Sequence, residues 1–391
     1  MKNVNENLTM NVKKTLILGL TVLSLLFVSC DPKDEPKVDE PQAKSELSGD
    51  ISTDVTLDAS IEYTLTGALQ IVDGGILRIP AGTVIKAEKG FNKYILVEKG
   101  GKIYVNGTAA NPVKMTSAAA SPEIADWGGL IINGKATLSG PAAGGVITAT
   151  TEINPSVLYG GNIDNDNSGV VEYLILEYTG AKSSANIEHN GLTLNGVGSG
   201  TRIENIYVVN GADDGVEFFG GSVSVTNLLV VNSEDDMFDV TQGWKGTLNN
   251  AYGVWLSGYT SSEGDPRGLE LDGNFDGLGP DDVNQSDFTM TNITVENKST
   301  FVMQDAVKVR RGAKANISNL LIKGGSCTDL IDMTDSKGAG NSATVISYKV
   351  DGMTISGSEV KNTTPASSIT VNAAHTGANT SVFAWTGYNF N

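Results

Sequence analysis

The chain has 391 residues and a formal net charge of −18, with 46 glycines but only two histidines and two cysteines. An acidic surface of this kind repels nucleic acid and anionic membranes, and no cluster of Lys or Arg offsets it. Nucleic acid is therefore excluded as a partner, and metal sites built from His or Cys are not available.

The N-terminus has the organisation of a bacterial export signal, predicted for residues 1–29. Two lysines precede an apolar stretch at 15–28, which is too short for a comfortable membrane span. Residues 27–30 resemble a lipobox, which implies cleavage before Cys30 and lipid attachment to its thiol. The alternative is a plain signal peptide with an incidental cysteine. In the lipoprotein interpretation Cys327 is a buried free thiol.

Residues 30–45 are rich in proline and in charges, mostly acidic. This composition cannot bury a core, so we predict an acidic, Pro-rich tether that starts at a lipidated Cys30. An acidic run directly after such a cysteine resembles the surface-export signal of Bacteroidota lipoproteins. The resemblance implies a surface-exposed lipoprotein of the bacterial outer membrane.

From residue 46 onward the chain consists of short alternating apolar runs separated by Gly, Asn and Asp. The runs at 74–79 and 100–105 lie 26 residues apart, and alternation places Leu77 and Ile79 inward. A stronger echo relates 205–217 to 227–239, which repeat each other after 22 residues. Amphipathic helix patterns are absent.

A constant offset without a helical period is typical of coils stacked in parallel. We therefore predict an all-β protein, a single-stranded parallel β-helix with about 22 residues per coil, over residues 46–391. Residues 340–391 are a candidate C-terminal cap. A leucine-rich repeat would need an L-x-x-L-x-L ladder, which is missing, and a β-sandwich would lack the constant offset.

An asparagine precedes the strand in several coils. In a β-helix such residues stack as an amide ladder at a corner, each side chain bonding to the next coil. The expected ladder consists of Asn205, Asn227, Asn249, Asn292 and Asn319. We interpret it as structural.

A second recurring pattern is an acidic residue followed three positions later by another charge, as in Asp214/Glu217 and Asp236/Asp239. If the coils stack, the later members form one column with a spacing of about 4.8 Å. The expected column is Glu217, Asp239, Glu270, Lys308 and Asp332. Neighbouring carboxylates at this spacing need a cation, a shared proton or solvent.

The column has two interpretations that the sequence leaves open. In one, Asp214, Glu217, Asp236, Asp239 and Glu270 bind Ca²⁺. A catalytic version of this interpretation uses Asp236 and Asp239 as acid and base, with Lys308 and Arg310 beside them. In the other, each Asp-Asp pair satisfies backbone groups of a solvated turn.

Two further segments resemble calcium loops. Asp272, Asn274 and Asp276 fit the first half of D-x-[DN]-x-[DN]-G, although the usual glutamate at the twelfth position is missing. Asp164 and Asp166 lie in a similar segment. Both are candidate Ca²⁺ sites.

Aromatic residues gather near the acidic coils. Trp244, Trp255 and Tyr259 would suit a glycan, because a sugar ring offers an apolar face and many hydroxyls. The alternative is that the tryptophans belong to the core.

The chain resembles the right-handed parallel β-helix lipoproteins of Bacteroidota. The resemblance is carried by Trp127-Gly-Gly, by the segment at 166–169, and by the runs that begin at Asp213 and Asp235. The superfold is shared with pectate lyases, which hold Ca²⁺ on stacked carboxylates and use Arg or Lys as base. Polygalacturonases pair a G-x-D-D motif with Gly-His-Gly, and the latter is absent here.

Three functions follow as hypotheses. The first is an exported, lipid-anchored cell-surface protein that binds an extracellular ligand, a glycan in preference to a protein, with Ca²⁺ as cofactor. The second is a polysaccharide lyase of the pectate-lyase type. The third is a structural or adhesive surface protein. Fold-level analogy alone cannot decide among them.

Overall fold

The structure is a computed structural model that describes residues 44–143, 145–184, 187–362, 364 and 366–390. The predicted signal peptide, the lipidation site Cys30 and all but the last two residues of the predicted tether lie outside the described residues. Those two residues, Lys44 and Ser45, are already part of the first strand.

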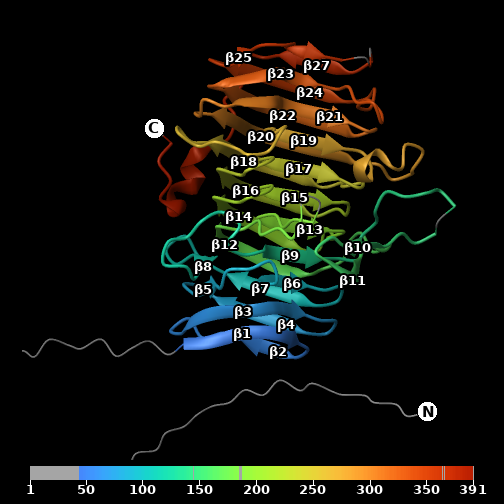
Figure 1. The fold of residues 1–391 in the computed structure, drawn as a ribbon. Helices are drawn as coiled ribbons and strands as arrows, with labels where there is room; N and C mark the ends of the chain where they lie inside the picture. Colours follow the sequence, from blue (N-terminus) through green and yellow to red (C-terminus); the bar gives the residue numbers. More distant parts are fainter. Residues whose placement is uncertain (1–43, 144, 185–186, 363, 365, 391) are drawn as a thin grey trace, which may run out of the picture.

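The predicted fold class is confirmed, because the chain forms a parallel β-helix whose main sheet contains 25 strands (Figure 1). All pairings between its strands are parallel, whereas β10 and β11 form a separate antiparallel hairpin. The strands are β1 Lys44–Ile51, β2 Asp54–Thr56, β3 Glu62–Ile71, β4 Ile76–Pro80, β5 Val84–Ala87, β6 Tyr94–Val97, β7 Lys102–Asn106, β8 Val113–Ser117, β9 Gly129–Asn133, β10 Ala149–Thr151, β11 Asn154–Tyr159, β12 Gly169–Glu177, β13 Leu192–Asn195, β14 Arg202–Val209, β15 Val216–Phe219, β16 Ser224–Val231, β17 Phe238–Thr241, β18 Thr247–Trp255, β19 Leu269–Asp272, β20 Asp287–Asn297, β21 Val302–Arg310, β22 Lys314–Lys323, β23 Ser326–Asp332, β24 Val345–Asp351, β25 Thr354–Ile355, β26 Val360–Lys361 and β27 Ser368–Val371. Two short 3-10 helices, η1 Phe275–Gly277 and η2 Thr380–Thr386, complete the described elements.

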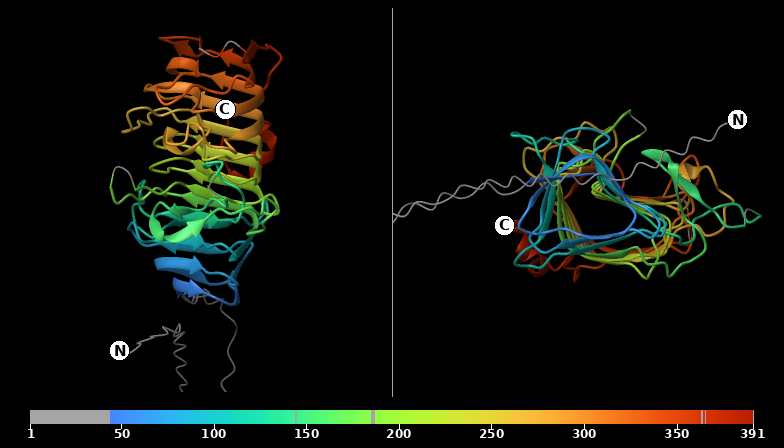
Figure 2. Two further views of the ribbon diagram at one scale, coloured as in Figure 1. Left: turned by 90° about the vertical axis from the view of Figure 1, so that its right-hand side faces the viewer. Right: turned by 90° about the horizontal axis from the view of Figure 1, so that it is seen from below.

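The strands stack into long columns along a prism of roughly triangular section (Figure 2). One column runs from β12 through β14, β16, β18, β20, β22 and β24 to β27. A second runs from β6 through β9, β13, β15, β17, β19 and β21 to β23. The outer face of this second column carries the candidate site.

The predicted coil length of about 22 residues does not hold throughout the stack. An offset of 22 holds where Val216 pairs with Phe238, but Phe238 pairs next with Leu269, and Leu130 pairs with Leu192. Long excursions leave the stack between these strands, and they include the β10–β11 hairpin. A β-helix tolerates such insertions because each one leaves and returns at a corner without disturbing the register of the strands.

Alternation along the strands places the apolar residues inside, as expected. Leu77 and Ile79 have no exposed surface, and they pair with Ile103 and Val105 in the next coil. The core is one continuous cluster along the axis of the prism. Cys327 is buried in this cluster as a free thiol, in agreement with the prediction.

The asparagine ladder exists, with one correction. Asn227 donates to Asn205 at 2.9 Å, and Asn250, not Asn249, donates to Asn227 at 2.9 Å. Asn250 is the residue with positive φ, 61°, a conformation that asparagine tolerates better than other side chains. Asn249 instead accepts from Asn292, so the ladder shifts by one residue in this coil. Asn319 then donates to Asn292 at 2.7 Å.

The C-terminal segment 372–390, which we call the C-terminal strap, runs back along the side of the prism (Figure 1). The backbone N–H of Asn379 donates to Asn250 at 2.6 Å, 129 residues away. Phe383 in η2 is fully buried against Leu229 and Val254. The strands β24 to β27 continue the helix, so the last segment lies beside the coils instead of capping the end.

Among the described residues, no helix combines the length and apolar character that crossing a membrane requires.

Candidate functional site

The predicted charged column is confirmed in full register. Glu217 pairs with Asp239, Asp239 with Glu270, Glu270 with Lys308, and Lys308 with Asp332. Their neighbours along each strand point inward to the core, so alternation turns these five side chains outward. The column therefore lies on the outer face of β15, β17, β19, β21 and β23.

A second column of aspartates stands three positions before members of the first, at the turns before β15 and β17 and within β21 and β23. The Asp214 carboxylate accepts the backbone N–H of Asp236 at 2.9 Å, and the Asp236 carboxylate accepts that of Arg267 at 2.6 Å. In the top coils Asp329 accepts the N–H of Ser358 at 2.7 Å. These aspartates hold neighbouring coils together, as expected if each Asp-Asp pair satisfies backbone groups of a turn. They are, however, buried and not solvated.

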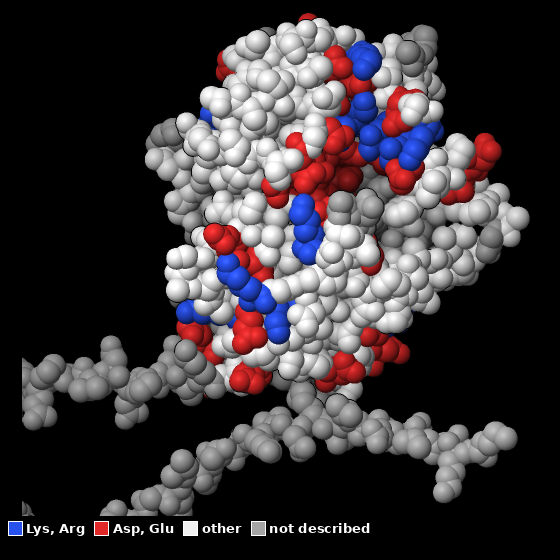
Figure 3. Space-filling model, in the orientation of Figure 1, with Lys and Arg blue, Asp and Glu red and all other residues white. Residues whose placement is uncertain are grey.

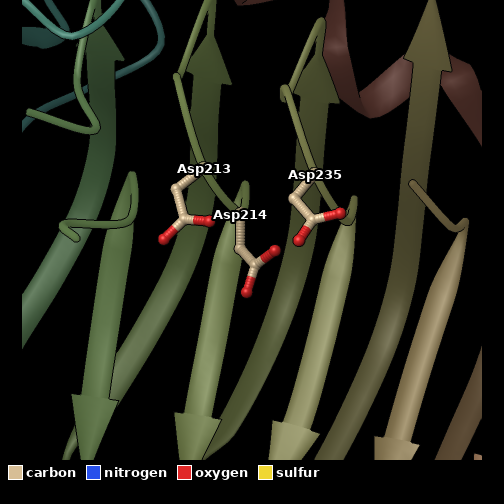
Figure 4. A group of neighbouring side chains, drawn as sticks. All are labelled: Asp213, Asp214 and Asp235. Atoms are coloured by element: carbon tan, nitrogen blue, oxygen red, sulfur yellow. The ribbon is translucent and has the colours of Figure 1, made fainter. Parts of the chain in front are cut away.

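The lower part of the two columns is a strip of carboxylates that form no salt bridge within the described part of the chain, and we call it the acidic strip. Its side chains gather on one face of the molecule beside a group of basic side chains (Figure 3). In Figure 4 the carboxylates of Asp213, Asp214 and Asp235 approach one another from the turns before β15 and β17. The strip consists of Asp213, Asp214, Glu217, Asp235, Asp236 and Asp239.

Oxygen atoms within the acidic strip are close enough to share a cation. Asp214, Glu217 and Asp239 each offer an oxygen, and these atoms lie within 4.8 Å of one another. The same holds for Asp213, Asp214 and Asp235. A Ca²⁺ ion with ligand distances of about 2.3–2.6 Å spans such separations.

Burial and mutual repulsion raise the pKa of these carboxyl groups. Burial and then the charge of Asp239 raise the pKa of Glu217 well above its usual range. Burial and then the charge of Asp213 do the same for the pKa of Asp214. Burial, assisted by Asp265, raises the pKa of Asp235 to about 7. The strip is thus poised to take up protons or a cation.

Two oxygens of the acidic strip have no hydrogen-bond partner among the described residues. They are Oδ1 of Asp235 and Oδ1 of Asp239, and both are buried atoms. A buried acceptor without a donor costs about 1–3 kcal/mol, so a ligand that satisfies it is favoured.

The upper part of the columns is an ion-pair network and not an open site. Arg310 contacts Glu270 and donates to Asp272 at 2.7 Å, and Lys308 donates to Asp332 at 2.6 Å. Arg267 donates to Glu270 and lies 3.3 Å from Asp305. The network consists of Arg267, Glu270, Asp272, Asp305, Lys308, Arg310, Arg311, Asp329, Asp332 and Lys361.

These contacts correct two of the sequence-based assignments. Lys308 and Arg310 are engaged by carboxylates, so neither is free to act as a base. Glu270 is held by Arg267 and Arg310, and its carboxylate belongs to a different oxygen group from that of Glu217. Glu217, Asp239 and Glu270 therefore do not converge on one ion.

The structure does not favour the predicted calcium loop at 272–276. Asp272 is neutralised by Arg310 and Arg311, and Asp276 is paired with Arg311 and Lys337. The Asn274 side chain is fully buried and accepts the Gly279 N–H through its own carbonyl oxygen. These oxygens therefore already have partners within the protein.

The second predicted calcium loop uses its carboxylates in a similar way. Asp166 accepts the backbone N–H of Lys135 at 2.8 Å, and Asp164 accepts that of Thr137 at 2.9 Å. Both carboxylates anchor the excursion after β9 to the stack. Neither belongs to a group of converging acidic oxygens among the described residues.

The prediction that Trp244 and Trp255 form a ligand surface is wrong. Both indoles are fully buried, and their ring N–H groups donate to the backbone carbonyls of Val223 and Ser233. Tyr259 is half-buried and packs against the core. These rings are part of the fold, as the alternative interpretation of the tryptophans held.

The structure reveals a pocket that the sequence did not indicate. It has a volume of about 400 Å³ and lies between the β10–β11 hairpin and the outer face of β9 and β13. Three rings line it, those of Tyr159, Phe219 and Phe275, and the Phe275 side chain is 47% exposed. Its polar lining consists of Thr150, Thr151, Glu152, Glu188, His189, Asn190, Thr193, Asn195 and Gln242.

The pocket and the acidic strip are contiguous. Asn190, which lines the pocket, donates to Glu217 at 2.6 Å. Thr193 precedes Glu217 in the same outward column, because it pairs with it in register. Tyr159 donates to Gln242 at 2.5 Å and so fixes the hairpin over β15 and β17.

The stacked parallel coils place the chain in the class of parallel β-helix domains. Within this class the chain belongs to the family described as pectate-lyase-like β-helix domains, whose model matches residues 49–389. No curated protein sequence matches the chain significantly.

Solved structures show remote similarity. Tailspike protein 2 of bacteriophage CBA120, in its enzymatically active domain, is 9% identical with a TM-score of 0.31, and the match covers 75% of this chain and 38% of that one. The catalytic domain of a GH87 α-1,3-glucanase in complex with tetrasaccharides is 11% identical with a TM-score of 0.36, covering 89% and 70%. These similarities are too remote to carry a functional argument.

Proposed function

We propose that this β-helix is a glycan-binding protein whose ligand occupies the pocket under the β10–β11 hairpin, next to a cation held by the acidic strip. The observation that carries the proposal is the composition of the pocket. It combines three rings with closely placed amide, hydroxyl and carboxylate groups on a rigid sheet.

The rings suit the apolar face of a sugar. Tyr159 and Phe219 pack edge to face with centroids 6.3 Å apart, and Phe219 and Phe275 lie 6.4 Å apart. Such a surface stacks on C–H groups, while Asn195 and Gln242 are placed to bond hydroxyls. The volume of about 400 Å³ lies within the range of small-ligand pockets.

The acidic strip fits a hard divalent cation, for which we propose Ca²⁺. Asp213, Asp214, Glu217, Asp235 and Asp239 supply only oxygen donors, which Ca²⁺ prefers. The free Oδ1 atoms of Asp235 and Asp239 support the fit. When bound, the cation would offset the repulsion within the strip and offer open positions to sugar oxygens.

The other two hypotheses receive less support. A lyase of the pectate-lyase type needs a free basic side chain beside the cation, whereas Lys308 and Arg310 are engaged in ion pairs. A purely structural role leaves unexplained the pocket and the free Oδ1 atoms of Asp235 and Asp239. We therefore favour binding.

For location, we propose an outer-membrane lipoprotein exposed at the cell surface, on the strength of the lipobox-like segment and the acidic run after Cys30. Cys30→Ser should move the protein from the membrane fraction to the soluble fraction. Unchanged membrane association would contradict the anchor.

A glycan array is the direct test of binding. The mature chain should bind a defined set of glycans, and Phe275→Ala should reduce the signal at least tenfold by removing the exposed ring. Leu278→Ala is the matched control, because Leu278 is also exposed, at 72%, on the same loop but does not line the pocket. Equal loss in both variants, or no binding to any glycan, would contradict the proposal.

The cation is tested separately by calorimetry and thermal melting. Ca²⁺ should raise the melting temperature and EGTA should reverse the effect. The double change Asp235→Asn and Asp239→Asn should abolish the response. Asp276→Asn is the control, because its carboxylate is paired with Arg311 and Lys337. A Ca²⁺ response that survives the double change would place the ion elsewhere.

A further inference from the structure

The ligand-binding pocket has an unusual charge pattern. Its lining contains two carboxylates, those of Glu152 and Glu188, and no lysine or arginine. The nearby Lys182 is shared between Glu188 at 3.1 Å and Glu263 at 3.3 Å, so it offsets only part of this charge, and Glu152 has no salt bridge among the described residues. An anionic ligand would therefore enter a negative pocket without a partner charge.

The buried polar atoms of the pocket that lack partners are all acceptors. His189 is 1% exposed, and its Nε2 lies 2.9 Å from the carbonyl oxygen of Phe91. A carbonyl only accepts, so the ring proton is on Nε2 and Nδ1 carries a lone pair. Nδ1 has no partner among the described residues. Burial lowers the pKa of His189 to about 4, which keeps the ring neutral at pH 7.

Asn190 adds a second free acceptor. It is 3% exposed, and its amide nitrogen donates to Glu217 at 2.6 Å. Its Oδ1 is then left without a donor among the described residues. Buried acceptors of this kind require a hydrogen-bond donor, which a ligand in the pocket can supply.

The surroundings reinforce the negative potential. The phenol of Tyr159 feels burial first and then the charges of Glu217 and Glu152, which together raise its pKa. The rings of Tyr159, Phe219 and Phe275 also favour a cation near their faces.

We infer that the pocket recognises a sugar with a free, protonated amino group. The ring of this sugar lies against Phe219 and Phe275, and its ammonium group donates to Glu188, Glu152 and Asn190. The inference rests on the proposed glycan binding and narrows it to one substrate class, the glycans with deacetylated amino sugars. An N-acetylated sugar lacks the charge, and a uronate has the wrong sign.

The test compares three oligosaccharides of equal length by calorimetry at pH 6 with EDTA present: β-1,4-linked glucosamine, the same oligomer N-acetylated, and oligogalacturonate. The glucosamine oligomer should bind at least tenfold more tightly than the other two, and added salt should weaken its binding. EDTA removes bridging metal ions, so that any preference reflects the pocket itself.

Variants show whether the pocket carboxylates cause the preference. Glu188→Gln and Glu152→Gln should each lower the affinity for the glucosamine oligomer at least tenfold and should change the weak binding of the N-acetylated oligomer much less. Glu263→Gln is the matched control, because Glu263 contacts the same Lys182 but does not line the pocket. Unchanged melting temperatures check that the variants fold.

The outcomes separate this inference from the proposed function. Equal binding of the charged and N-acetylated oligomers would overturn the amino-sugar inference and keep the glycan pocket. Tighter binding of oligogalacturonate in EDTA would overturn the charge argument as well. Failure of every glycan, both here and on the array, would overturn the proposed function itself.

Discussion

The two parts of the charged column share one backbone and differ in charge balance. In the acidic strip, Glu217 and Asp239 have no basic side chain within salt-bridge distance among the described residues. Two coils further along, the equivalent Lys308 and Asp332 form a pair at 2.6 Å. The same register therefore supports either a stabilising network or a strip that can hold a ligand. In the proposed function, the ligand and the cation therefore bind where the charge pairing is incomplete.

The largest expected effect comes from breaking the ion-pair network at its centre. Arg267→Met should destabilise the protein by about 3–5 kcal/mol, because it leaves the buried carboxylates of Glu270 and Asp305 without their partner. Urea unfolding measures this. Arg202→Met, which breaks the exposed pair with Glu172, is the control and should cost less than about 1 kcal/mol. Similar losses of stability in both variants would show that the buried network contributes no more than an exposed ion pair.

The second expected effect is a pH dependence opposite to that of ordinary paired carboxylates. The pKa of Asp235 rises from 3.8 to about 7 in the folded protein. Its contribution to stability is therefore fully present below pH 4 and is lost as the pH rises through 7. In EDTA, roughly 2 to 3 kcal/mol should disappear between pH 4 and pH 7.

Asp235→Asn should flatten this pH profile, which chemical denaturation at each pH would reveal. Asp332 provides the contrast. Although burial raises it, bonds from Lys308 and Thr334 keep the pKa of Asp332 below its usual range. Its contribution is thus present above pH 4 and is lost on acidification. A stability difference between the wild type and Asp235→Asn that stays constant between pH 4 and pH 7 in EDTA would contradict the raised pKa of Asp235.

A third pair of variants compares equivalent positions directly. Asp239→Asn should leave the protein as stable in EDTA or slightly more stable, because burial and then the charge of Asp272 raise the pKa of Asp239 and disfavour its ionised form. Asp332→Asn should destabilise it by about 1–2 kcal/mol, because it weakens bonds from Lys308 and Lys361. Both are measured by urea unfolding at pH 7. Changes of the same sign would remove the distinction between the two parts.

The smallest expected effect is a response to salt. Raising NaCl from 0.05 to 0.5 M in EDTA should stabilise the wild type by roughly 0.5 kcal/mol, because ions screen the repulsion within the acidic strip. The double change Asp213→Asn and Asp235→Asn should remove most of this gain. The melting temperature at each salt concentration is the measurement. A gain of the same size in the variant would assign the effect to another part of the surface.

The sequence predicted the fold and the column because both depend on local pattern. The echo between 205–217 and 227–239 carries the strand register with it, so Glu217 opposite Asp239 follows directly. The sequence pattern could not show which basic residue pairs with each carboxylate. Arg267 lies at the end of an excursion, and only the folded chain shows that it contacts Glu270 and Asp305.

The sequence pattern alone could not predict the pocket or the direction in which the tryptophan side chains point. Tyr159 meets Gln242 across 83 residues, through a hairpin that belongs to no repeat. Trp244 stands in a turn, where alternation does not assign a direction. In the structure it turns inward between Phe218 and Phe288, with ring centroids 4.3 and 5.3 Å away. Contacts of excursions and corners arise from tertiary packing.

The C-terminal strap changes how cooperative this protein can be. In a stack of coils each unit contacts only its neighbours, so the ends can fray one coil at a time. The strap bonds Asn319 and Asn250 and packs Trp385 on Tyr173, which ties coils from β12 to β22 to one segment. These coils must therefore release together. During synthesis the strap is made after the coils that it covers, so the apolar outer face around Leu229 and Tyr252 stays uncovered until translation has passed residue 383.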